Sequence, residues 1–204
     1  MINLGHGSQI QIFDKLDGMM GQYKFSMASV NISQTQTIVP RLDYSKNLLA
    51  QIIDDLKNKK SQLEKTNRLL QIELEDKDQA YPKTIDLERT VCFSLEILYW
   101  IQKRIGSVSK IHAIPKIFPS TIHMIRTISA QIVDILPKSS RQLSELSVHL
   151  SSIVLDSATI TKAQFDFGKS NLDSSMLLDE VKLMVDSKLR KQYHHLNFFT
   201  VPNT

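Results

Sequence analysis

Apolar residues recur at three- and four-residue steps along most of the chain, a spacing typical of helices that bury one face. Two stripes are the longest, one within residues 41–79 and one within residues 82–111. In the first, leucines fall seven residues apart, as in a coiled coil, at Leu42, Leu49, Leu56, Leu63 and Leu70. The second comprises Leu87, Val91, Leu95, Leu98, Ile101, Ile105 and Val108. Both patterns predict long helices.

A short break between the two stripes predicts an antiparallel helical hairpin. Pro82 interrupts the helical pattern, and Thr84 is the residue type that caps a following helix. The seam of this hairpin is expected to join one leucine row to one apolar row. These rows are Leu49, Leu56, Leu63 and Leu70 on the first helix, and Leu87, Val91, Leu98 and Ile105 on the second.

Three further stripes predict three shorter helices, so the expected fold class is all-α. Isoleucines mark the first at Ile122, Ile125, Ile128, Ile132 and Ile135; the second runs through Leu143, Leu146, Leu150, Ile153 and Val154; the last carries Leu177, Val181, Met184, Val185 and Leu189. Pro137 suits the first turn of the second of these helices. We therefore predict a flexible N-terminal arm over 1–39, a helical core over 40–156, a Ser- and Thr-rich linker over 157–174, a C-terminal helix over 175–192 and a tail over 193–204.

The charge of the chain is unevenly distributed. The formal net charge is +4, yet residues 97–141 alone carry seven basic side chains and one acidic side chain. Candidate contacts with an anionic membrane or with a neighbouring subunit are Lys103, Arg104, Lys110, Lys116 and Arg126. A solvated face of a helical bundle explains the same charges equally well. Nucleic-acid binding is a third reading, but no recognised reader motif accompanies the charges, so no nucleic-acid partner is expected.

Catalytic and metal-binding chemistry is not expected. The histidines lack the helical pair spacing of a metal site, and no cofactor motif is present. Cys92 is the single cysteine and lies within a predicted helix, which favours a small buried side chain in a reducing compartment over a nucleophile. No signal peptide or membrane-spanning run is recognised. We therefore expect a cytoplasmic protein that is not an enzyme.

Five short segments follow one another along the predicted helices: Leu87-Glu88-Arg89, Ile105-Gly106-Ser107-Val108, Ile135-Leu136-Pro137, Gln142-Leu143-Ser144-Glu145-Leu146 and Leu177-Leu178-Asp179-Glu180-Val181. Taken in this order, they resemble archaeal ESCRT-III-like cell-division proteins of the CdvB type. The resemblance spans residues 41–192.

This resemblance implies a long helical hairpin with shorter helices folded on it, and subunits that polymerise into filaments. Such filaments remodel or constrict membrane during cytokinesis, on the inner face of the cell membrane or at the division site. Implied partners are further copies of the chain, related subunits, an anionic membrane surface and an AAA+ ATPase that grips C-terminal motifs. Direct docking of that ATPase on Phe198-Phe199-Thr200-Val201-Pro202 stays open. An alternative is a coiled-coil adaptor that binds a partner protein through its apolar stripe without polymerising on membrane.

Overall fold

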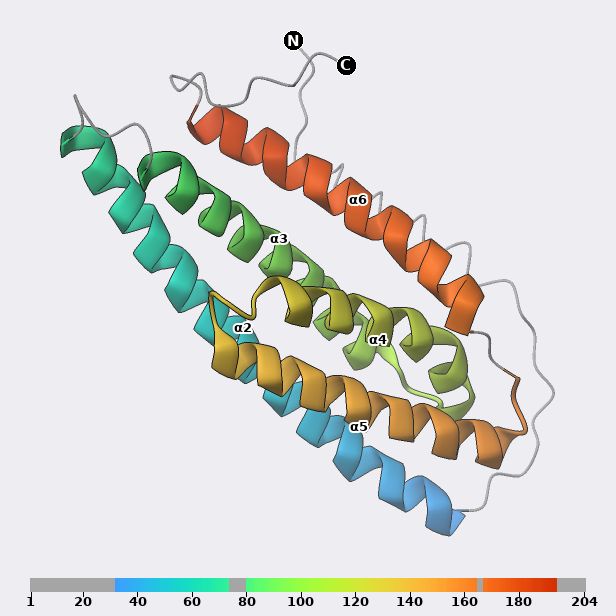
Figure 1. The fold of residues 1–204 in the computed structure, drawn as a ribbon. Helices are drawn as coiled ribbons and strands as arrows, with labels where there is room; N and C mark the ends of the chain where they lie inside the picture. The colour runs from blue at the N-terminus through green and yellow to red at the C-terminus, as the bar shows by residue number, and fades with distance from the viewer. Residues whose placement is uncertain (1–31, 74–79, 165–166, 194–204) are drawn as a thin grey trace.

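The computed structural model describes residues 32–73, 80–164 and 167–193, and these residues are almost entirely helical (Figure 1). The elements are α2 (Ile32–Glu73), α3 (Ala80–Ser107), the short 3₁₀ helix η1 (Ile111–Ala113), α4 (Ile114–Gln131), α5 (Pro137–Thr161) and α6 (Phe167–Gln192). Within these ranges there is no strand. The predicted all-α class is confirmed.

The two longest helices, α2 and α3, lie side by side and run in opposite directions (Figure 1). The predicted seam residues Leu49, Leu56 and Leu63 of α2 are buried, as are Val91, Leu98 and Ile105 of α3. Leu70 and Leu87 are only partly buried. Both lie toward the closed end of the hairpin, which α4 and α5 do not cover (Figure 1).

A second antiparallel pair, α4 and α5, packs on the other half of the hairpin. Serines at the contact allow the two helices to approach closely: Ser129 Oγ donates to Ser140 O, and Ser140 Oγ donates to Ser129 O, each at 2.8 Å. The helix α5 also lies along α2, where Ser139 Oγ donates to Asp55 Oδ2 at 3.2 Å. The N-terminal half of α2 is therefore covered by α5.

The last helix, α6, returns along α3 and α4 (Figure 1). It buries a stripe that faces both of them: Leu177, Leu178, Val181, Val185 and Leu189. Each such side chain contributes roughly 1.5–3 kcal/mol of transfer free energy before the entropy of ordering is subtracted. The helix is thus an integral part of the packed structure.

The first helix of the hairpin begins earlier than predicted. Residues 32–39, expected in the arm, belong to α2, and Ile38 there is only 2% exposed. Pro40 and the polar residues before it suggest a helix boundary, yet Pro40 lies inside α2. Burial of Ile38 and Leu42 against the body outweighs these local signals. Residues 1–31 of the predicted arm lie outside the described residues.

The second hairpin helix also begins before its predicted cap. The helix α3 starts at Ala80, four residues before Thr84, and Pro82 lies in its first turn. This position suits proline, because an amide in the first turn has no partner within the helix. Residues 74–79 lie outside the described residues.

The predicted linker over 157–174 is wrong in most of its length. The helix α5 continues to Thr161 and α6 starts at Phe167, eight residues before the predicted start at 175. Hydroxyl groups that suggested a loop instead donate to carbonyls of the preceding turn, as Ser157 does to Val154 and Thr161 to Ser157. The helix ends where Lys162 adopts a left-handed conformation with φ 52°. Of the predicted tail over 193–204, Tyr193 is buried and the rest lies outside the described residues.

Candidate functional site

Four of the five basic candidates flank the connection between α3 and α4. Lys103 and Arg104 lie in the last turns of α3, Lys110 precedes η1, and Lys116 is in the first turn of α4. The side chains of Lys103, Lys110 and Lys116 are exposed. Among the described residues, neither Lys103 nor Lys110 forms an ion pair. We call these four residues the basic end.

One member of the basic end, Arg104, is restrained by a neighbour. Its guanidinium lies 4.3 Å from the centre of the Trp100 ring, a cation–π contact that favours this position. Slight desolvation lowers the pKa of the exposed Lys116 below its usual value. The basic end thus combines three exposed lysines with one arginine that packs on an aromatic ring.

Arg126 does not join the basic end. It lies ten residues beyond Lys116 on α4, which corresponds to roughly 15 Å of helix. Its Nη2 atom is 3.5 Å from Ser151 Oγ of α5. Sequence proximity alone grouped it with the others.

A further lysine belongs near this end and was missed. Lys162 follows α5, and the end of α5 lies at the same end of the bundle as the connection between α3 and α4 (Figure 1). Its side chain is exposed. The sequence analysis missed Lys162 because it placed this residue in a linker, whereas its position beside the basic end depends on α5 ending at Thr161.

At the other half of the hairpin, a buried polar cluster joins three helices. Asn67 of α2 and Glu88 of α3 are fully buried, and Tyr193 follows α6 directly. Asn67 Nδ2 donates to Glu88 Oε2 at 2.5 Å, and the Tyr193 hydroxyl donates to the same oxygen at 2.6 Å. Asn67, a polar residue on the buried side of α2, thus has a specific partner in Glu88. Tyr193 connects the end of α6 to the same carboxyl group.

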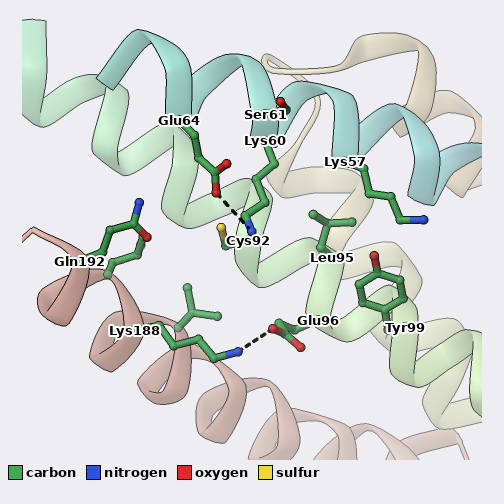
Figure 2. Close-up of a pocket in the computed structure, with 12 residues that line it drawn as sticks. Lys57, Lys60, Ser61, Glu64, Cys92, Leu95, Glu96, Tyr99, Lys188 and Gln192 are labelled. Carbon is green, nitrogen blue, oxygen red and sulfur yellow. Dashed lines mark hydrogen bonds and ion pairs between the residues drawn. The ribbon is translucent and has the colours of Figure 1, made fainter. Parts of the chain in front are cut away.

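Two ion pairs extend the contact between α3 and α6. Arg89 Nε lies 2.9 Å from Asp186 Oδ1. Lys188 Nζ lies 2.8 Å from Glu96 Oε1, and Figure 2 shows this second pair. The pair of Lys188 with Glu96 is partly exposed and contributes at most about 1 kcal/mol. In the other pair, the Arg89 Nε and Asp186 Oδ1 atoms are themselves buried.

A groove of about 360 Å³ lies between α2, α3 and α6 (Figure 2). Its lysines already have acidic partners: Lys60 pairs with Glu64 at 3.3 Å, as Lys188 does with Glu96. An incoming anion would therefore compete with carboxylates, which makes the groove a poor anion site. Cys92 also lines it, and burial raises the pKa of its thiol to about 11. At neutral pH this thiol is a weak nucleophile.

Histidines do not assemble a metal site in the part of the chain that is described. No group of three His, Cys, Asp or Glu side chains there is placed to hold a metal ion. Burial, with a smaller effect of the Arg126 charge, lowers the pKa of His123 below 6.5. His149 Nε2 lies 3.6 Å from Glu145 Oε1 on the surface of α5. His194 and His195 lie outside the described residues.

No helix in the described ranges is both long enough and apolar enough to span a membrane. No protein-family model matches the chain, and no solved structure matches it significantly.

Proposed function

We propose that this protein is an ESCRT-III-like subunit that polymerises on anionic membrane and remodels or constricts it during cell division. The observation that carries this proposal is the basic end, where Lys103, Arg104, Lys110 and Lys116 gather beside the last turns of a long helical hairpin. A hairpin of two long helices supplies a stiff subunit. Its charged end supplies a contact with lipid headgroups.

The expected strength of this contact follows from the number of charges. A basic side chain near an anionic membrane contributes about 1 kcal/mol, so four of them contribute about 4 kcal/mol, roughly a thousandfold in partitioning. The attraction acts within a Debye length, about 8 Å near 0.15 M salt. Binding should therefore be reversible and sensitive to salt.

Self-association is proposed to use the surface that α6 covers. The helix is tied to α3 by Tyr193 and by two ion pairs, and it buries apolar side chains of α3 and α4. Release of α6 would expose this apolar surface to a second copy or a related subunit. An AAA+ ATPase that pulls on the C-terminal region would act on the same helix. The site of action would be the inner face of the cell membrane.

An adaptor that binds a partner protein is the second candidate, and one observation favours it. Val148 and Leu155, seven residues apart on α5, are 66% and 56% exposed. Two exposed apolar side chains on one helical face provide a small docking surface for a partner helix. Such a protein would bind its partner without dependence on lipid charge.

Co-sedimentation with vesicles separates the two candidates. Changing Lys103, Arg104, Lys110 and Lys116 to glutamate should abolish sedimentation with anionic vesicles, and neutral vesicles should bind the unmodified protein poorly. A matched control carries the same change in net charge on α2, farther from the basic end, at Lys57, Lys59, Lys65 and Arg68, and should retain binding. Equal binding of the unmodified protein to neutral and anionic vesicles would reject the electrostatic membrane role and favour the adaptor as the function.

A further inference from the structure

Two exposed serines lie within the basic end. Ser107 is the last residue of α3, and Ser109 lies in the irregular segment before η1. Arg104 precedes Ser107 by three residues, and Lys103 precedes it by four. Basic side chains at these spacings before an acceptor serine suit protein kinases with an acidic substrate groove. Ser109 has no basic residue three or four positions before it.

We propose that Ser107 is a phosphorylation site for such a kinase, and that the phosphate releases the basic end from anionic membrane. The second half of this inference rests on the proposed function, whereas the first half does not. In the reaction the Ser107 Oγ forms a bond to the γ-phosphorus of ATP while the bond from that phosphorus to the β,γ-bridging oxygen breaks. ADP leaves with the electron pair, and the hydroxyl proton passes to the carboxylate base of the kinase.

Two features weaken the last turn of α3, which must unwind for Ser107 to enter a kinase active site in an extended segment. Gly106 precedes Ser107, and a Cβ added there would meet nothing within 4 Å. Its φ is not positive, so neither space nor backbone conformation demands glycine. Glycine nevertheless weakens a helix relative to alanine. The final backbone hydrogen bond of the turn, from Val108 N to Ile105 O, is also long at 3.4 Å.

Unwinding of the last turn of α3 would stop at Ile105. Ile105 is fully buried and anchors α3 immediately before Gly106. The Ser107 hydroxyl donates only to Arg104 O within its own turn, at 2.8 Å, so fraying breaks no contact with another helix through this group. The backbone is already extended at Lys110, three residues after Ser107, with φ −130° and ψ 133°. A kinase therefore needs to unwind only the end of α3.

Phosphate at Ser107 would oppose the charges around it. It adds about −1.5 to −2 charges at pH 7, close to half of the positive charge of Lys103, Arg104, Lys110 and Lys116. It also stands at the C-terminal end of α3, where the helix dipole disfavours an anion. The expected result is a roughly 10- to 30-fold weaker partitioning onto anionic vesicles.

Mapping the modified residue tests the first half. The full chain is incubated with ATP and a purified kinase that selects arginine three residues before the serine, and phosphate is located by mass spectrometry. Ser107→Ala should lose the phosphate and Ser109→Ala should keep it. Gly106→Ala should slow the reaction about fivefold, because it stabilises the turn that must open. Phosphate that persists in Ser107→Ala, or an unchanged rate in Gly106→Ala, would overturn the proposal.

Vesicle binding tests the second half on the same samples. Phosphorylated full chain should bind vesicles of phosphatidylserine and phosphatidylcholine 10- to 30-fold more weakly than unmodified chain. Unchanged binding after complete modification of Ser107 rejects release by phosphate. Absence of binding by the unmodified chain instead contradicts the proposed membrane function, while the mapped site at Ser107 would stand.

Discussion

Removal of one hydroxyl group should loosen α6. In Tyr193→Phe the ring still fills its site, but Glu88 Oε2 loses the hydrogen bond of 2.6 Å from the tyrosine and keeps only Asn67 Nδ2. A typical hydrogen bond contributes about 0.5–1.5 kcal/mol net. The population with α6 released should therefore rise by about 2- to 12-fold.

Cys92 provides the readout for this change. It lines the groove between α2 and α6 with a pKa of about 11, so a thiol reagent modifies it slowly while α6 is docked. Release of α6 removes Val185 and Leu189 from the wall of the same groove, which exposes the thiol and lowers its pKa. The modification rate should rise in proportion to the released population. It is measured with an aromatic disulfide reagent at pH 8.

Tyr44→Phe is the matched control. It deletes the same hydroxyl from a tyrosine that donates to Glu145 Oε1 at 2.7 Å on the surface between α2 and α5, far in sequence from α6. Its Cys92 rate should equal that of the unmodified protein. Equal rates in Tyr193→Phe and Tyr44→Phe would refute the reasoning that the buried cluster holds α6.

Two further predictions concern α6 and His123. Truncation after Gln164 removes α6 while leaving α5 whole. It should increase polymerisation, measured by light scattering and electron microscopy. A truncated chain that assembles no more readily than the full chain would show that α6 does not restrain assembly. Because the pKa of His123 is lowered in the folded state, the unfolded state binds the extra proton as pH falls below about 6.5. The free energy of unfolding, measured in denaturant titrations, should decline from pH 7 to pH 5, and less so in His123→Gln. An equal decline in His123→Gln would contradict this role of His123.

Helical periodicity was sufficient to predict the α-helices α2 to α6 of the described residues and the burial of most apolar side chains in the rows along α2 and α3. Leu49 and Leu98 are buried as their spacing indicates. An apolar repeat sustained over many helical turns predicts the buried face even where single residues depart from the pattern. Helix ends were predicted less well. Ser157 and Thr161 were interpreted as loop residues, yet their hydroxyls bond within α5, and only tertiary packing decides between these outcomes.

The candidate site was partly predictable for a related reason. Lys103 and Lys110 are close in sequence to the turn that gathers them, so a charge count along the chain found them. Lys162 depends on where α5 ends, and the cluster of Glu88 with Tyr193 joins residues 105 positions apart. No local pattern reveals a contact between residues so distant in sequence.

The central claim is tested most directly by electron microscopy of the purified protein with anionic vesicles, with neutral vesicles and without lipid. We predict filaments on anionic vesicles accompanied by deformation of the membrane, few on neutral vesicles, and none in the variant with glutamate at Lys103, Arg104, Lys110 and Lys116. A protein that stays in one fixed oligomer under all three conditions, with smooth vesicles of either charge, would contradict the proposed filament.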